Sequence, residues 1–279
     1  MDQKKVLTIQ DISCVGRCSL TAALPVISAA GIETSVIPTA VLSTHTGGFT
    51  DYTYRDLTDD IEPIVSHWKS LNLSFDAVYT GYLGSFEQLR LVSDIFSTYK
   101  TPENLIIVDP VMADNGVLYG GFSEEFPKGM AELCKKADIV VPNLTEAAFL
   151  LGNEYKETYD QKYIENLLKD LRDLGCGNIV LTGVSFEENK LGTASYDGSE
   201  ISYCFKEQID GYYHGTGDIY ASTLTAAMLR FGSLKEASEA AVDFTVECIK
   251  ATVGSERETK YGVNFETCIP YLIKRLKLI

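Results

Sequence analysis

The sequence predicts an α/β fold in which a mostly parallel central sheet carries helices on both faces. Six short runs of β-branched and other apolar residues alternate with longer segments that have helical spacing. Runs that are apolar throughout suit strands buried on both faces, and their alternation with helices is typical of parallel sheets. We therefore expect a three-layer α-β-α sandwich. A chain of 279 residues that is 45% hydrophobic can form one large core, so we expect a single domain over residues 1–279.

The predicted elements follow one another in a regular order. The apolar runs predict strands over residues 5–10, 34–41, 75–80, 104–109, 138–141 and 178–182. The segments between them predict helices over residues 19–30, 57–71, 85–100, 123–136, 143–151 and 160–174. Beyond residue 182 the pattern changes, because two strand-like pieces flank the turn Asp197-Gly198 and indicate a hairpin over 191–196 and 200–207. Helices over 216–231, 234–253 and 264–276 then complete the chain.

Charge and cysteine usage exclude several classes of function. The chain has 24 Lys and Arg residues against 39 Asp and Glu residues, and its formal charge is −15. This charge repels nucleic acid and anionic membranes, so any nucleotide site must be corrected locally by amides, helix ends or a cation. The seven Cys form no Cys-x-x-Cys pair, and the three His are dispersed, so no zinc-site pattern is present. No apolar run is long enough for a signal peptide or a membrane span. We expect a cytoplasmic protein with reduced thiols and no nucleic acid or membrane partner.

Ligands of open α/β sheets bind at the carboxyl ends of the strands, so the loops there are the candidate sites. The segment His214-Gly215-Thr216-Gly217-Asp218 precedes a predicted helix. Its glycines allow close approach of the backbone to a ligand, and the amides at the start of the helix favour an anion. A glycine turn with an acidic residue that complements the helix dipole explains the same residues equally well. The segment is neither a Walker P-loop nor a dinucleotide-binding Gly-x-Gly-x-x-Gly motif.

Two further segments carry carboxylates suited to a metal ion and phosphates. Asp109 follows the strand-like run Leu-Ile-Ile-Val, and Asp114 follows in a turn, so both could hold Mg²⁺ directly or through water. Asn143 and Glu146 come after the next run, three residues apart, which places them on one face of a helical turn. Ordinary turn chemistry is the alternative explanation for Asp109 and Asp114. A helix capping box is the alternative explanation for Asn143 and Glu146.

Two more loops offer groups for an organic substrate. The segment 43–48 contains two hydroxyl residues, His45, Thr46 and two glycines, although most such loops only connect elements. Tyr82 lies in Gly81-Tyr82-Leu83-Gly84-Ser85, where its ring could cover a flat ligand or pack in the core.

The order of these segments resembles the ribokinase-like superfamily and, within it, the pyridoxal (vitamin B6) kinases. The resemblance covers residues 5–253. The segments that carry it are IQD at 9–11, LSTHTGGF at 42–49, TGYLGS at 80–85, VDPVMAD at 108–114, VPNLTE at 141–146, VLTG at 180–183 and HGTGDIYAS at 214–222. The resemblance implies a ribokinase-like fold, ATP and Mg²⁺ as cofactors, a monovalent cation by analogy alone, and a homodimer.

The resemblance also implies roles for individual residues. Asp218 matches the catalytic base that takes the proton of a hydroxymethyl group and thereby contacts the substrate. Gly215, Thr216 and Gly217 match the anion hole, in which the two glycines also contact the nucleotide. The remaining positions matched to the nucleotide are Asp109, Asp114, Asn143, Glu146, Thr182 and Gly183, and those matched to the metal are Asp109, Asp114 and Glu146.

His45, Thr46 and Tyr82 match positions that line the B6 pocket. The chain has Asp11 where pyridoxal kinases often have Ser, and we expect Asp11 to contact the substrate and to favour the cationic aminomethyl arm of pyridoxamine. Two other functions fit the same residues. The first is a hydroxymethylpyrimidine kinase of thiamin synthesis, and the second is a vitamer- or nucleotide-binding sensor without turnover. Asp218 argues against the sensor, because binding alone needs no base.

Overall fold

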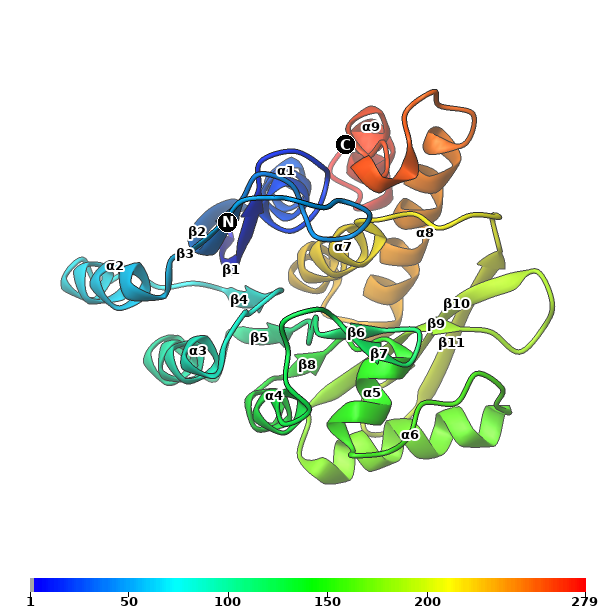
Figure 1. The fold of residues 1–279 in the computed structure, drawn as a ribbon, viewed down its shortest axis with the longest axis horizontal. Coiled ribbons are helices and arrows are strands. Elements are labelled where there is room, and N and C mark those ends of the chain that lie inside the picture. The colour runs from blue at the N-terminus through cyan, green and yellow to red at the C-terminus, as the bar shows by residue number, and fades with distance from the viewer. Residues whose placement is uncertain (1–2) are drawn as a thin grey trace.

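The computed structural model describes residues 3–279 and contains a nine-stranded central sheet within that range (Figure 1). The strand order is β11-β10-β9-β8-β5-β4-β1-β2-β3. All neighbours between β9 and β2 are parallel, whereas β10, β11 and β3 are antiparallel to their neighbours at the two edges. The prediction of a mostly parallel sheet is therefore confirmed.

The strands of this sheet are β1 (Lys5–Ser13), β2 (Glu33–Leu42), β3 (Tyr54–Asp56), β4 (Ala77–Thr80), β5 (Leu105–Val108), β8 (Ile139–Val140), β9 (Asn178–Val184), β10 (Lys190–Tyr196) and β11 (Ile201–Glu207). A separate two-stranded ribbon pairs β6 (Ala113–Asp114) with β7 (Val117–Leu118). The central strands β4, β5 and β8 are nearly or wholly buried, as continuous apolar runs predict.

Helices cover both faces of the sheet. They are α1 (Leu20–Ala29), α2 (Thr58–Ser70), α3 (Phe86–Tyr99), α4 (Phe126–Cys134), α5 (Leu144–Leu150), α6 (Gln161–Leu174), α7 (Thr216–Phe231), α8 (Leu234–Thr252) and α9 (Ile269–Arg275), with short 3-10 helices η1 (Thr259–Tyr261) and η2 (Glu266–Cys268). One apolar cluster joins α2 to α6 to one face of the sheet, and a second joins α1, α7, α8 and α9 to the other face (Figure 1). This arrangement confirms the predicted three-layer sandwich.

Helix α6 shows how the sequence determines such an element locally. Asp160 caps its start by accepting a hydrogen bond from the backbone amide of Tyr163 at 2.8 Å. Its buried residues Ile164, Leu167, Leu168 and Leu171 recur at helical spacing and face the sheet. Gly175 ends the helix with a φ of 113°, a backbone conformation that L side chains disfavour.

The structure departs from the sequence-based elements in two places. The strands β3, β6 and β7 were not predicted, because runs of two or three residues lack a readable period. The predicted helix over 264–276 is shorter, since η2 precedes α9 and Pro270 sits in the first turn of α9, where its missing amide costs nothing.

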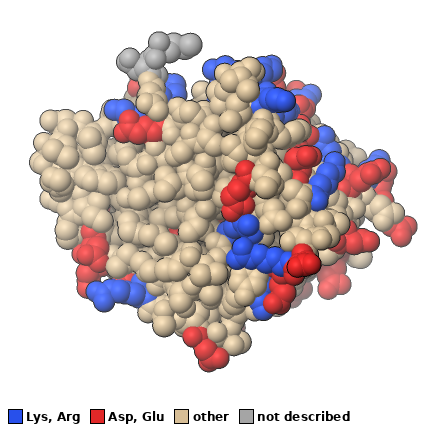
Figure 2. Space-filling view, turned by 90° about the horizontal axis from the view of Figure 1, so that it is seen from above, with Lys and Arg blue, Asp and Glu red and all other residues tan. Residues whose placement is uncertain are grey.

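The helices within residues 3–279 include none that combines the length and apolar character needed to cross a membrane. On the face drawn in Figure 2, Lys and Arg side chains lie among Asp and Glu side chains. That face therefore offers no continuous basic surface of the kind that nucleic acid binding needs.

Candidate active site

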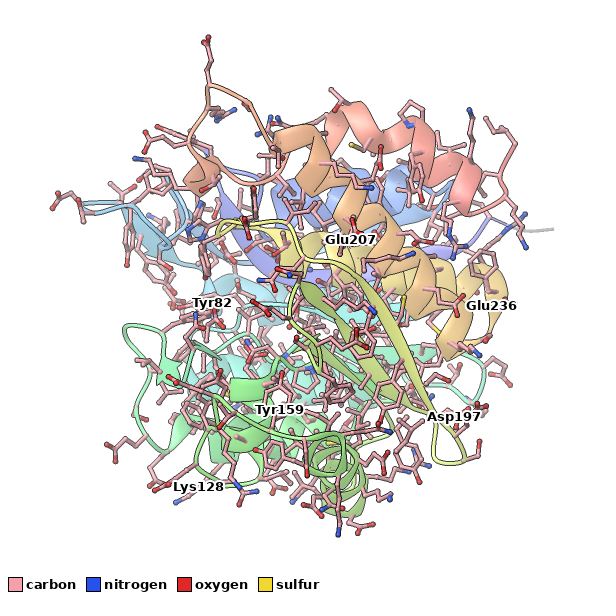
Figure 3. All side chains as sticks on the ribbon, turned by 90° about the vertical axis from the view of Figure 1, so that its right-hand side faces the viewer. Tyr82, Lys128, Tyr159, Asp197, Glu207 and Glu236 are labelled. Carbon is pink, nitrogen blue, oxygen red and sulfur yellow. The ribbon has the colours of Figure 1, made fainter. Side chains whose placement is uncertain are left out.

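The predicted site residues lie at the carboxyl ends of neighbouring parallel strands. Asp11 lies near the end of β1, and Tyr82, which is labelled in Figure 3, follows β4. Asp109 follows β5, Asn143 follows β8, and Gly183 lies near the end of β9. Because these ends share one edge of the sheet, residues far apart in the sequence surround one location.

The start of α7 closes against the loop that follows β1. Gly215 has a φ of 76°, and a Cβ atom there would lie 2.0 Å from the carbonyl oxygen of Arg17. Only glycine fits this contact. A Cβ atom at the exposed Gly217, by contrast, would meet nothing within 4 Å. The first turn of α7 is therefore accessible at Gly217. The first amides of a helix have no partner within the helix, so this turn is a favourable place for an anion.

Asp218 lies in that first turn and is only partly exposed. Burial raises its pKa from 3.8 to about 7; a hydrogen bond from the Ser19 backbone opposes this rise, and the charge of Asp11 adds to it. A carboxyl group with a pKa near neutrality can be ionised in the resting protein and can still accept a proton during a reaction. The Asp218 side chain thus has the electrostatic properties of a general base.

Asp109 and Glu146 form a second, deeper pair of acidic groups. Asp109 is buried, and its pKa is raised well above the usual range by burial and by the charges of Glu146 and Asp218. Burial also raises the pKa of Glu146 to about 8, against backbone hydrogen bonds that lower it. The carboxyl oxygens of Glu146 accept hydrogen bonds from the backbone amides of Met112 at 3.1 Å and Asn143 at 2.9 Å. Two buried carboxyl groups of this kind hold little negative charge near neutral pH unless a cation binds beside them.

Asn143 and Glu146 form the capping box that their spacing allowed. The Asn143 side chain accepts the Glu146 amide at 2.9 Å, and the Glu146 side chain accepts the Asn143 amide. The Asn143 amide group also donates to the carbonyl of Ala113 at 2.8 Å. Both residues thus have a structural role, which joins α5 to the ribbon of β6 and β7.

Asp114 lies apart from the buried pair, in β6. Its carboxylate accepts hydrogen bonds from the Tyr212 hydroxyl at 3.1 Å and from the backbone of Asn115 at 2.9 Å. Within residues 3–279 no three His, Cys, Asp or Glu side chains are arranged to hold a metal ion. Asp109, Asp114 and Glu146 are therefore not brought into one three-ligand centre. The carboxyl oxygens of the buried Asp109 and Glu146 are hard donors of the kind that Mg²⁺ prefers.

His45 is buried and fixed in one orientation. Its Nδ1 accepts the amide of Gly47 at 3.1 Å, so Nε2 carries the proton and donates to the carbonyl of Lys260 at 2.5 Å. Burial lowers the pKa of His45, which keeps the ring neutral. Its ring lies 5.2 Å from that of His214, so the loop after β2 contacts the loop before α7. Thr46 next to it is exposed.

Tyr82 lies partly buried, with its ring 5.6 Å from that of Phe122. Thr182 and Gly183 lie on the far side of the site, where the Thr182 hydroxyl donates to the carbonyl of Pro142 at 3.5 Å. A Cβ atom on Gly183 would meet nothing within 4 Å, so this strand end is open to a ligand.

Three contacts at the site were not predicted. Arg17 packs its carbonyl against Gly215, Ser19 hydrogen-bonds to Asp218, and Tyr212 hydrogen-bonds to Asp114. Arg17 and Ser19 belong to a polar turn without a recognised motif. The run Tyr212-Tyr213-His214 directly before the glycine turn was a signal that could have drawn attention to Tyr212.

The site keeps its acidic groups without basic partners. Within residues 3–279, every Lys or Arg that forms an ion pair does so with an acidic residue other than Asp11, Asp109, Glu146 or Asp218. Buried charges without partners are costly, so the arrangement favours cationic ligands or a metal-bound anion.

Comparisons with known proteins agree on one family. A model of the phosphomethylpyrimidine kinase family matches residues 16–263. A provisionally assigned phosphomethylpyrimidine kinase of Bacteroides thetaiotaomicron, crystallised with pyridoxal, is 36% identical with a TM-score of 0.92, over 97% of this chain and 96% of that one. The pyridoxal kinase of Lactobacillus plantarum is 30% identical with a TM-score of 0.91, over 98% of both chains. The pyridoxal kinase of Dictyostelium discoideum is 29% identical over 91% of this chain and 88% of its own length.

Proposed function

Because the chain belongs to the phosphomethylpyrimidine kinase family, in the ribokinase-like superfamily, we propose that it phosphorylates vitamin B6 compounds. The reaction would move the γ-phosphoryl group of ATP to the 5′-hydroxymethyl group of pyridoxal, pyridoxamine or pyridoxine. The observation that carries this proposal is Asp218, a carboxyl group with a pKa of about 7 in the open first turn of α7. The relatives described as pyridoxal kinases and the related structure with pyridoxal support the choice of substrate.

The described residues support a role for this chain in each step of such a transfer. Phosphoryl transfer depends mainly on positioning and charge neutralisation. Asp218 would orient the substrate hydroxyl and accept its proton, while the amides of Gly215, Thr216 and Gly217 would stabilise charge on the phosphoryl oxygens.

Mg²⁺, bound together with ATP, neutralises phosphate charge, and Asp109 and Glu146 are the residues that would hold it, with Asp114 nearby in β6. Asn143, Thr182 and Gly183 would border the nucleotide. His45, Thr46 and Tyr82 would border the pyridine ring.

The test is an ADP-release assay with pyridoxal, pyridoxamine, pyridoxine and hydroxymethylpyrimidine, for the wild type, Asp218→Asn and Asp173→Asn. Asp173 is an exposed acidic residue near the end of α6, so its variant makes the same chemical change far from the site. We expect ADP release with the B6 compounds and a loss of about 10²–10⁴-fold in Asp218→Asn alone. A folded Asp218→Asn protein that retains the wild-type kcat would overturn the role of Asp218.

Phosphorylation of hydroxymethylpyrimidine is the second candidate, because the family model carries the pyrimidine kinase description and a relative from Aquifex aeolicus has that activity in its name. That relative is 32% identical over 62% of this chain, whereas the pyridoxal kinase matches extend over nearly the whole chain. The same assay separates the two, since a pyrimidine kinase would release more ADP with hydroxymethylpyrimidine than with any B6 compound. A sensor without turnover would release none.

We also propose that the protein works in the cytoplasm as a homodimer of single-domain chains. All seven cysteines are free in the structure, which fits a reducing compartment. Light scattering coupled to size-exclusion chromatography tests the dimer.

A further inference from the structure

Asp11 is a buried carboxyl group that no basic side chain accompanies. It is 4% exposed, and no Lys, Arg or His within residues 3–279 forms an ion pair with it. The pairing of β1 with β2 shifts register between Gln10 and Ile12, and such irregularities redirect the side chain they contain. The hydroxyl of the fully buried Ser13 donates to Asp11 at 3.3 Å and holds it in place.

The surroundings of Asp11 place it on the substrate side of the site. Ser19 joins Asp11 to Asp218, because its side chain hydrogen-bonds to Asp11 and its backbone hydrogen-bonds to Asp218. Strand β1, which carries Asp11, pairs with β4, which Tyr82 follows. Burial raises the pKa of both Asp218 and Tyr82, and the charge of Asp11 adds to each rise. The pKa of Asp109, in contrast, is raised by burial and by the charges of Glu146 and Asp218. The acidic groups therefore form two sets with Asp218 between them: Asp109 and Glu146 on the phosphate side, and Asp11 towards the ring of Tyr82.

Because of this division, one positive ligand beside Asp109 and Glu146 would leave Asp11 without a partner. An ion bound with the phosphates could neutralise Asp109 and Glu146, whereas Asp11 is not among the groups whose charge affects Asp109. A buried carboxylate without a cation is unfavourable, so Asp11 is either protonated or paired with a positive group of the substrate.

We propose that Asp11 binds an amine on the ring carbon next to the one that carries the hydroxymethyl group, and thereby makes pyridoxamine the preferred B6 substrate. The inference rests on the proposed function. When the hydroxymethyl group lies on Asp218, the substituent on the neighbouring ring carbon is the next group outwards, which matches the position of Asp11 beside Asp218. Pyridoxamine carries an ammonium group on that arm, pyridoxine carries an alcohol, and pyridoxal carries an aldehyde.

The physical basis for selection is the strength of the contact. An ammonium group gives an ionised carboxylate both a charge-assisted hydrogen bond and the attraction of an opposite charge, whereas an alcohol gives only the hydrogen bond. Pyridoxine is the suitable reference, because its arm has nearly the same size as that of pyridoxamine and lacks only the charge. Hydroxymethylpyrimidine also carries an amino group on the neighbouring carbon, but an uncharged one, so Asp11 should favour it less.

The experiment compares kcat/KM for pyridoxamine and pyridoxine in the wild type, Asp11→Asn and Asp11→Ser. The ratio of the two values should fall about tenfold or more in both variants. Asp56→Asn is the matched control. Asp56 is exposed on β3 and also raises the pKa of Tyr82, so it reports whether any lost charge near the ring changes the ratio.

Each outcome separates the inference from the proposed function. A wild type that phosphorylates no B6 compound rejects the proposed function itself. An unchanged ratio in both Asp11 variants of an active enzyme rejects only the role of Asp11. If either variant is inactive with both substrates, calorimetry without nucleotide decides: a lost preference for binding pyridoxamine over pyridoxine supports the role, and a preference equal to the wild type rejects it.

Discussion

The substitution Asp218→Asn should make the protein more stable while it removes most activity. In the wild type, burial and the nearby Asp11 raise the pKa of Asp218 to about 7. Folding at neutral or higher pH therefore forces an ionised carboxylate into surroundings that disfavour its charge. Asn has nearly the same shape and no charge, so it removes this cost together with the base.

The magnitude follows from the two pKa values. The ionisation equilibrium moves from a pKa of 3.8 to about 7, and each tenfold change corresponds to ~1.4 kcal/mol, which gives roughly 4 kcal/mol as an upper limit. Asp218 is partly exposed, and solvent screening reduces the effect, so we expect Asn to raise the free energy of unfolding by ~1–3 kcal/mol at pH 8. The folded state binds the extra proton between the two pKa values, so the gain should shrink below pH 7 and disappear near pH 4.

Urea unfolding at several pH values, followed by circular dichroism, measures this gain. The Asp173→Asn variant is the control, because its exposed carboxyl group should leave the free energy of unfolding unchanged at every pH. A loss of stability in Asp218→Asn at pH 8, or a gain that grows as the pH falls, would refute the electrostatic reasoning.

The two remaining predictions concern the same turn of α7. In the pH profile, kcat/KM should rise as the pH passes through about 7, because Asp218 must be ionised to accept a proton; a wild-type profile that is flat there would contradict this assignment. Gly215→Ala should lower the free energy of unfolding by ~2 kcal/mol or more and abolish ADP release, because its Cβ atom would meet the Arg17 carbonyl at 2.0 Å. Gly232→Ala is its control, since Gly232 ends the same helix with a φ of 70° and open space around it; equal losses in the two variants would show that only backbone strain matters.

The sequence was sufficient for the parts of the fold that depend on local pattern. The parallel strands were predicted because their apolar runs reflect burial on both faces, and α6 was predicted because its period, cap and final glycine agree. The ribbon of β6 and β7 depends instead on contacts with a distant part of the chain, such as the bond from Asn143 to Ala113. Contacts of this kind leave no period in a sequence.

In the candidate site, too, some residues could be predicted from local sequence pattern, whereas others depend on contacts with distant parts of the chain. The strand-end rule brought together Asp11, Asp109 and Asp218, which are separated by about a hundred residues each in the chain. Ser19 hydrogen-bonds to Asp218, and the carbonyl of Arg17 packs against Gly215. Both residues come from a turn whose sequence resembles any polar loop. The position of that turn is set by tertiary contacts, so residue types alone could not place it.

The distribution of charge explains how a protein with a formal charge of −15 could bind a nucleotide at all. The site contains no basic side chain paired with its central carboxyl groups within residues 3–279, so correction of the field must come from the α7 amides and from cations that arrive with the ligands. ATP without a metal ion would place phosphate charge beside Asp109 and Glu146, and an uncharged ring substituent would leave Asp11 unpaired. Binding of the metal-bound nucleotide and of a cationic substrate would therefore each lower the electrostatic cost that the other encounters at Asp218.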